Sequence, residues 1–150
     1  MNSELILGID PGTAITGYGV VARECGSAVL LVECGVVRTS TDETLAVRIR
    51  EIYDEVTEII VRHGPSVIVV EDVFLGKNVQ SALKLGHARG AILLAAALAE
   101  IPVAEYTPRE IKKAVVGNGN ATKEQVGFMV QQQLRLKTVP TPSDAADGVA

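Results

Sequence analysis

The sequence predicts an α/β fold in three layers, in which helices flank a five-stranded mixed sheet made of an antiparallel meander plus parallel strands. Three observations indicate this class. Residues 1–38 hold apolar stretches separated by short turns, which is typical of a meander. Residues 42–63 change to the period of an amphipathic helix. Beyond them, short apolar strands alternate with helical segments, the pattern of parallel crossovers.

Length and composition describe one globular unit. A chain of 150 residues is the size of one domain, so we expect a single domain over residues 1–150. The start of the chain lacks the basic and apolar regions of a signal peptide. The longest apolar run, Ala91 to Ala99, is too short to span a bilayer. We therefore expect a cytoplasmic protein with no membrane association.

The meander is expected to consist of strands at residues 4–10, 16–25 and 28–38. The first strand ends in a carboxylate, Asp10, and turns at once through Pro11-Gly12, a dipeptide typical of tight bends. Asp10 allows two interpretations. It is either a turn acid that hydrogen-bonds its own backbone or an ionisable group placed for chemistry at the mouth of a buried strand.

The middle of the chain predicts two helices around a buried strand. Gly64-Pro65 ends the helix over residues 42–63. The β-branched run at residues 67–70 is typical of a strand buried on both faces, and it too ends in a carboxylate, Glu71. A helix over Val79 to Ala99 follows, almost without polar residues in its second half.

Cap residues mark the remaining elements. A short strand at residues 103–106 leads into Thr107-Pro108-Arg109-Glu110, a capping box with proline at the first helical position. Thr122 and Gln125 have the spacing of a second, looser capping box. Residues 117–120 are expected to form a turn between the two helices. A last helix opens at residues 141–143, and we expect it to be cut off at the C-terminus.

Charge is distributed unevenly along the chain, although the net charge of −4 by itself argues against nucleic acid. Residues 1–75 hold five basic and twelve acidic side chains, whereas residues 76–137 hold nine basic and four acidic ones. This asymmetry is compatible with a phosphate-binding surface on one side of an acidic body. A solvated helix face with paired charges is the alternative.

Four acids are expected to converge. Asp10 and Glu71 end neighbouring parallel strands, and ligands sit beyond the carboxyl ends of such strands. Asp144 and Asp147 lie at i and i+3 in the first turn of the last helix, where acids are also common for structural reasons. Asp72 competes with Glu71, but adjacent strand residues point to opposite faces, so only one of them faces the site.

This set of acids predicts a metal-dependent hydrolase. Four oxygen ligands without histidine or cysteine suit Mg²⁺ or Mn²⁺ rather than zinc. Two ions roughly 4 Å apart can hold a scissile phosphate, one activating water and the other stabilising the leaving oxygen. Phosphodiester hydrolysis is the reaction that this arrangement favours.

Together, four segments carry a resemblance to a known family: Gly8-Ile9-Asp10-Pro11-Gly12, Glu71-Asp72-Val73-Phe74 with Lys77-Asn78, Ser81 to Gly86, and Asp144-Ala145-Ala146-Asp147. The chain resembles the RuvC family of bacterial Holliday junction resolvases, within the ribonuclease H-like superfamily, over essentially its whole length. The resemblance implies a structure-selective endonuclease of recombination and repair. It would cut four-way junctions by paired symmetric nicks in strands of like polarity, with two Mg²⁺ ions per site or Mn²⁺ in their place. The branch-migration proteins RuvA and RuvB are the partners that it implies.

The resemblance also implies roles for individual residues. Asp10, Glu71, Asp144 and Asp147 would be the catalytic acids and the metal ligands. Lys123, counted with the catalytic residues, and Lys112 match basic positions near the cleaved strand, and Phe74 matches an aromatic used against junction bases. The set of expected DNA-binding residues is Phe74, Lys77, Asn78, Lys84, Arg89, Lys112 and Lys123. Without the resemblance, Phe74 could be a core residue and the two lysines solvated helix charges.

Two other classes of function compete with this interpretation. Asp10-Pro11-Gly12-Thr13 resembles the phosphate loop of actin-like ATPases and sugar kinases, but that architecture needs two such domains. The second alternative is a nucleic-acid-binding module without catalytic activity, and the intact set of four acids argues against it.

The helix over residues 79–99 predicts a homodimer. Its second half is apolar almost all round, and such a helix must be covered on more than one side. A two-fold dimer with one set of acids per subunit suits two opposed cuts in a junction. The alternative is that another helix of the same chain buries this surface.

Overall fold

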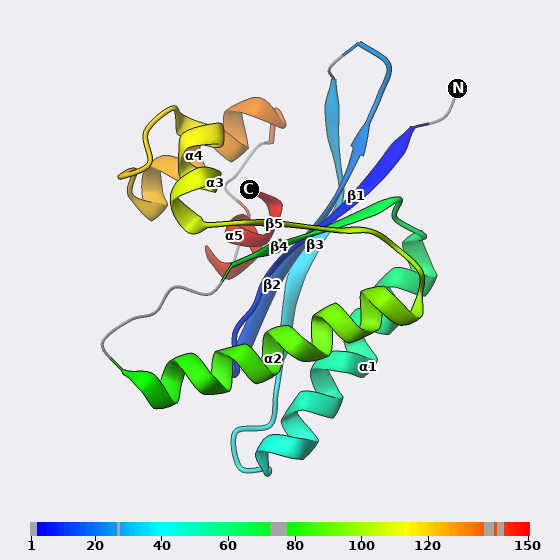
Figure 1. The fold of residues 1–150 in the computed structure, drawn as a ribbon. Coiled ribbons are helices and arrows are strands. Elements are labelled where there is room, and N and C mark those ends of the chain that lie inside the picture. Colours follow the sequence, from blue (N-terminus) through cyan, green and yellow to red (C-terminus); the bar gives the residue numbers. More distant parts are fainter. Residues whose placement is uncertain (1–2, 27, 73–77, 137–139, 141–142) are drawn as a thin grey trace.

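The computed structural model describes residues 3–26, 28–72, 78–136, 140 and 143–150. The elements follow the predicted order (Figure 1): β1 (Glu4–Asp10), β2 (Ile15–Arg23), β3 (Val29–Arg38), α1 (Leu45–His63), β4 (Val67–Glu71), α2 (Val79–Leu98), β5 (Val103–Tyr106), α3 (Pro108–Val116), α4 (Lys123–Gln133) and α5 (Ser143–Val149).

The sheet is mixed, as predicted, with strand order β3-β2-β1-β4-β5. The pairs β1/β2 and β2/β3 are antiparallel, whereas β1/β4 and β4/β5 are parallel. β1 is therefore the central strand and β4 its parallel neighbour. This arrangement puts the ends of β1 and β4, with their carboxylates, at the same edge of the sheet.

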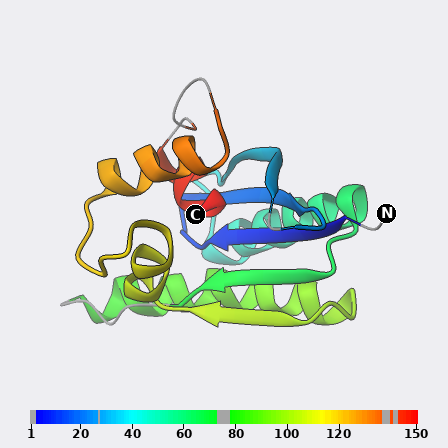
Figure 2. The same ribbon diagram turned by 90° about the horizontal axis from the view of Figure 1, so that it is seen from above.

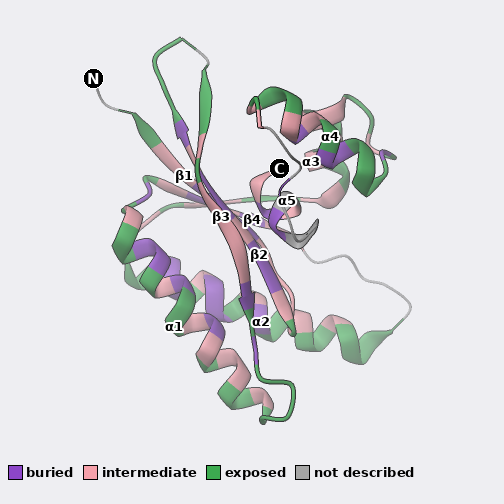
Figure 3. Cartoon of the chain, turned by 180° about the vertical axis from the view of Figure 1, so that it is seen from behind, coloured by how far each residue is buried: buried purple, intermediate pink, exposed green. Residues whose placement is uncertain are grey.

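Helices lie on both faces of the sheet, so the three predicted layers are confirmed (Figures 1 and 2). α1 and α2 pack together over one face. Figure 3 shows buried residues along them and exposed residues on their outer sides. The main core lies between these helices and the sheet and includes Leu7, Val20, Ile52, Ile68 and Ile92. On the other face, α5 lies against β1 and β2, and α4 packs on α5.

Local capping sets the helix boundaries. The first helix begins at Leu45 rather than at residue 42, because Thr44 is its N-cap and accepts a hydrogen bond from the Val47 backbone N–H. Both predicted capping boxes are present, at Thr107 and at Thr122. The turn between β2 and β3 is longer than predicted, since β2 ends at Arg23 and β3 begins at Val29. A hydrogen bond from Glu24 N–H to the Ala28 carbonyl oxygen closes it.

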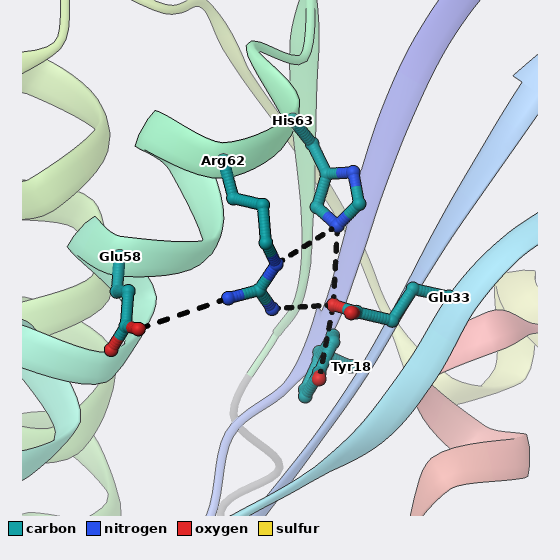
Figure 4. A network of polar contacts seen from close by, with 5 residues as sticks. All are labelled: Tyr18, Glu33, Glu58, Arg62 and His63. Carbon is teal, nitrogen blue, oxygen red and sulfur yellow. Dashed lines mark hydrogen bonds and ion pairs between the residues drawn. The ribbon is translucent and has the colours of Figure 1, made fainter.

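A cluster of polar side chains ties the edge strand β3 to the end of α1 (Figure 4). Glu33 Oε2 accepts hydrogen bonds from Arg62 Nη2 at 2.6 Å and from the Tyr18 hydroxyl at 3.2 Å, and His63 Nε2 lies 3.2 Å away. Burial raises the pKa of Glu33, but the hydrogen bonds from Arg62 and His63 outweigh it and the pKa falls below its ordinary value. The cluster joins β2 and β3 to the end of α1, and it includes none of the acids described below.

The outer side of α2 leaves large apolar side chains exposed. We call Val79, Leu83, Leu94 and Leu98 the outer α2 face; their exposed fractions lie between 52% and 70%. The inner side of α2, with Ala88, Ala91, Ile92, Ala95 and Ala96, is buried against the core. α1 and the sheet therefore cover only part of this apolar helix. No helix in the described part of the chain has the length and hydrophobicity needed to cross a membrane.

Candidate active site

Asp10 and Glu71 lie side by side at one edge of the sheet. Ile9 pairs with Val70 in the parallel ladder, and each acid is the next residue of its strand. Both carboxyl groups line the same small cavity. The prediction that the ends of β1 and β4 bring two acids together is confirmed by this geometry.

Helix α5 brings a third acid, Asp147, to the same place. Its backbone lies directly on two glycines of the sheet. A Cβ at Gly8 would stand 2.5 Å from the Gly148 carbonyl oxygen, and a Cβ at Gly19 would stand 2.7 Å from Val149 Cα. Real Cβ atoms do not approach backbone atoms so closely, so any side chain here would push α5 away. The glycines thus allow the seating of α5 that sets the position of Asp147.

A cavity of about 150 Å³ joins the acids to two lysines. Its polar lining consists of Asp10, Glu71, Asp147, Lys112 and Lys123. Pro108, Ile111, Val126 and Ala150 complete the wall. Lys123 Nζ lies 3.3 Å from Asp147 Oδ2, an ion pair between α4 and α5. A larger and mainly apolar hollow of about 1110 Å³ adjoins the site and shares Glu71 and Asp147 with it.

The electrostatics of Glu71 reflect this crowding. Burial raises the pKa of Glu71 to about 8, together with the hydrogen bond to Asp10 and the charges of Asp10 and Asp147. The ammonium group of Lys112 acts in the opposite direction. In the absence of metal, Glu71 therefore stays largely protonated at neutral pH, as expected of a carboxyl group that is buried beside other acids.

This donor set fits a divalent cation. Carboxylates are the ligands that Mg²⁺ and Mn²⁺ prefer. Burial is the main cause of the raised pKa of Glu71, and a cation between the acids would favour the ionised form and offset both this burial and the charges of Asp10 and Asp147. Among the described residues, no group of three or more histidine, cysteine, aspartate or glutamate side chains is arranged to hold a metal ion. Asp144 lies one turn before Asp147 on α5, and its side chain is outside the described part.

The other predicted site residues are spread over several elements. Lys84 is exposed on α2, and Asn78 is the N-cap of α2, its Oδ1 accepting a hydrogen bond from Ser81 N–H at 3.2 Å. Phe74 and Lys77 lie outside the described residues. Between the competing neighbours, Glu71 rather than Asp72 lines the cavity, as predicted.

Arg89 does not fit the prediction that it contacts DNA. Its side chain is only 15% exposed, and its guanidinium pairs with two acids of this chain, Asp72 and Glu105. A cation enclosed in this way has little surface to offer a phosphate. We therefore leave Arg89 out of the proposed DNA-binding surface.

The seating of α5 on the glycines was missed by sequence reasoning, although a signal was present. Gly8 and Gly19 stand opposite each other in neighbouring antiparallel strands, so they leave one bare area of sheet surface. A strand glycine often marks a place where another backbone approaches closely. The sequence alone did not indicate which segment approaches there.

The fold and the acids at the end of its central strands define a nuclease domain of the ribonuclease H-like kind. The family model described as "Crossover junction endodeoxyribonuclease RuvC" matches residues 6–150. Two relatives with that name come from Pelotomaculum thermopropionicum and Shewanella amazonensis. They are 50% and 51% identical over 146 residues, which is 97% of this chain and 88% and 83% of theirs. The chain belongs to the RuvC family.

Solved structures agree with this assignment. The structure of Thermus thermophilus RuvC in complex with a Holliday junction substrate superposes with a TM-score of 0.87 at 37% identity, covering 97% of this chain and 88% of that one. The yeast mitochondrial Holliday junction resolvase shares the fold, with a TM-score of 0.68 at 14% identity, over 97% of this chain and 75% of that one. The predicted fold class is therefore confirmed.

Proposed function

We propose that the chain resolves four-way DNA junctions in recombination and repair by hydrolysing phosphodiester bonds at the cavity between β1, β4 and α5. The observation that carries the proposal is the convergence of Asp10, Glu71 and Asp147 with two lysines on one cavity. The fold around it closely matches that of a relative solved with a Holliday junction substrate.

Asp10, Glu71, Asp144 and Asp147 would hold two Mg²⁺ ions, and Mn²⁺ should substitute because it prefers the same ligands. When bound, the ions would activate water for attack and stabilise the charge that develops on the phosphate. Both tasks need ionised acids. Lys112 helps here because its charge lowers the pKa of Glu71.

Lys123 has a second role in this proposal. Its ammonium group is paired with Asp147 at 3.3 Å, but the side chain is 64% exposed, so it can reach a phosphate that enters the cavity. Pro108, Ile111 and Val126 line the same cavity with apolar surface and limit the access of bulk water. The chain thus offers anionic groups for the metal and a cationic group for the substrate.

The wider DNA-binding surface would include Lys77, Asn78 and Lys84 near the start of α2, with Phe74 stacking on junction bases. Lys84 is exposed, as a phosphate contact requires. Because the relatives are bacterial proteins named for action on crossover junctions, the proposal also places this chain in the cytoplasm. By family, RuvA and RuvB are its proposed partners.

A homodimer would carry two such sites. A Holliday junction has near two-fold symmetry, so two opposed sites can make paired nicks in strands of like polarity. The outer α2 face supplies an apolar surface for this contact, because its four large side chains are more than half exposed. Burying them in the dimer would remove that surface from water.

The test uses variants of the acids on a synthetic junction. Asp10→Asn, Glu71→Gln, Asp144→Asn and Asp147→Asn should each abolish cleavage while leaving junction binding largely intact, since these acids would hold metal rather than most of the DNA backbone. Glu55→Gln, an exposed glutamate on α1, is the control and should cut as the wild type does. Any of the four variants that cut at nearly the wild-type rate would remove its residue from the site.

A further inference from the structure

Arg89, on α2, is a largely enclosed arginine that pairs with one acid directly after β4 and one acid on β5. Arg89 Nη2 lies 2.6 Å from Glu105 Oε1 and 3.5 Å from Asp72 Oδ1. Its Nε and Nη2 atoms are shielded from solvent. The two carboxylates are roughly half exposed, so the cation is the enclosed member of the cluster. We call Arg89, Asp72 and Glu105 the Arg89 cluster.

The cluster lies on the side of the sheet opposite the cavity. Glu105 pairs with Val70 in the parallel ladder, and Val70 is buried in the core beneath α1 and α2. The next pair, Glu71 and Tyr106, points to the opposite face because strand residues alternate. Glu71 therefore faces the cavity while Glu105 faces Arg89 on α2.

Asp72 connects the two sides. It directly follows Glu71, and its backbone N–H donates a hydrogen bond to the Tyr106 carbonyl oxygen at 2.7 Å, which extends the ladder one step beyond β4. Its side chain reaches Arg89. Arg89 thus binds Asp72, the residue after Glu71. Its neighbours on α2, Ala88 and Ile92, are buried in the core and fix this part of the helix.

Enclosing the charged side chain of Arg89 has a free-energy cost, because it shields a guanidinium from water. Because both carboxylates are roughly half exposed, such an ion pair is weak support for stability alone. Its better attested effect is to fix one geometry among several. Here the geometry that it fixes is the end of β4, where the side chain of Glu71 begins.

We propose that Arg89 is a positioning residue for junction cleavage: by holding Asp72 and Glu105, it sets the direction of the Glu71 carboxylate toward Asp10. The inference rests on the proposed function, because it assigns Arg89 to the cleavage step rather than to DNA binding. It also joins α2, which carries the proposed dimer surface, to the active-site edge of the sheet.

The first measurement separates cleavage from binding. Arg89→Gln should slow single-turnover cleavage by roughly 10- to 100-fold, as loss of supporting residues around metal ligands does. Its junction affinity and the salt dependence of that affinity should match those of Arg50→Gln. This control removes the same charge from an exposed ion pair with Asp54 on α1. Arg89→Lys, which keeps the charge, should fall between Arg89→Gln and the wild type.

The second measurement needs neither DNA nor metal. Hydrogen exchange of the Asp72 amide should be at least about tenfold faster in Arg89→Gln than in the wild type, because the ladder beyond β4 loses its anchor. The exchange should be unchanged in Arg50→Gln. If the wild type fails to cut junctions, the proposed function fails, and the exchange measurement still decides whether Arg89 holds the end of β4.

Four outcomes would overturn the inference. Two of them are wild-type cleavage by Arg89→Gln and an unchanged exchange rate at Asp72. Another is a salt slope lower than that of Arg50→Gln by about 0.9, which would make Arg89 a phosphate contact. The last is that Val56→Ala, a core variant of α1 outside the cluster, loses as much cleavage as Arg89→Gln when both variants lower the melting temperature by the same amount. That result would reduce Arg89 to a stability residue.

Discussion

The raised pKa of Glu71 gives a prediction about stability in the absence of metal. The pKa of Glu71 is raised from 4.5 to about 8 in the folded protein. A carboxyl group with a raised pKa binds its proton more tightly when folded. Its contribution to stability is therefore fully present below about pH 4.5 and is lost as the pH rises through 8.

The size of the effect follows from the same values. One pH unit corresponds to about 1.36 kcal/mol. The interval from 4.5 to about 8 then corresponds to an upper bound on the order of 5 kcal/mol for the free energy of unfolding. Between pH 5 and pH 9 the undiscounted loss is about 4 kcal/mol, and partial exposure of the side chain reduces it, so we expect a loss of roughly 2–4 kcal/mol. Glu71→Gln cannot ionise and should lack this loss.

The assay is urea denaturation in the presence of EDTA at several pH values, for the wild type, Glu71→Gln and the exposed control Glu55→Gln. Glu71→Gln should be the most stable of the three at pH 9, although it cannot cut DNA. Added Mg²⁺ should stabilise the wild type at pH 9 and have little effect on Glu71→Gln. Parallel curves for the wild type and Glu71→Gln would show that the acids at this edge are not crowded and would refute the electrostatic account.

Three further predictions concern the seat of α5, the lysines and the dimer. Gly19→Ala should displace α5 and raise the Mg²⁺ concentration needed for half-maximal cleavage. The control Val20→Ala, on the opposite face of the same strand, should only lower the melting temperature. Equal Mg²⁺ requirements in the two variants would contradict the proposed role of Gly19. Lys112→Ala and Lys123→Ala should each lower the slope of log affinity against log salt by about 0.9 if they contact phosphates. An unchanged slope would indicate that Lys112 and Lys123 are solvated helix charges that do not contact DNA. Leu94→Glu should convert a sedimenting dimer into a monomer, and a wild-type monomer at tens of micromolar that still makes paired cuts would exclude the dimer.

Much of the fold follows from local signals in the sequence. Thr107 and Thr122 mark helix starts because their side chains cap the backbone, and both caps are present. The meeting of Asp10 and Glu71 was predictable because parallel neighbours end at the same edge of a sheet. These features depend on residues close in the sequence or on a general rule of topology.

Other features depend on contacts between distant residues and could not be predicted. Gly19 lies against Val149, a residue near the other end of the sequence. In the sequence, the only sign of this close approach is a glycine within a strand. Arg89 was counted with the DNA-binding side chains because charge along the sequence does not show which partner a cation meets. In the structure its partners are Asp72 and Glu105, so the cation lies inside the protein.

The most direct test of the central claim is cleavage of a synthetic four-way junction by the wild-type protein, with and without Mg²⁺ and with the cut sites mapped on all four strands. The acids at the ends of β1 and β4, with those on α5, should produce paired symmetric nicks in two strands of like polarity only when Mg²⁺ is present. A linear duplex of the same sequence should remain uncut. Cleavage in EDTA, equal cutting of the linear duplex, or junction binding in Mg²⁺ without any cut would contradict the assignment of this site.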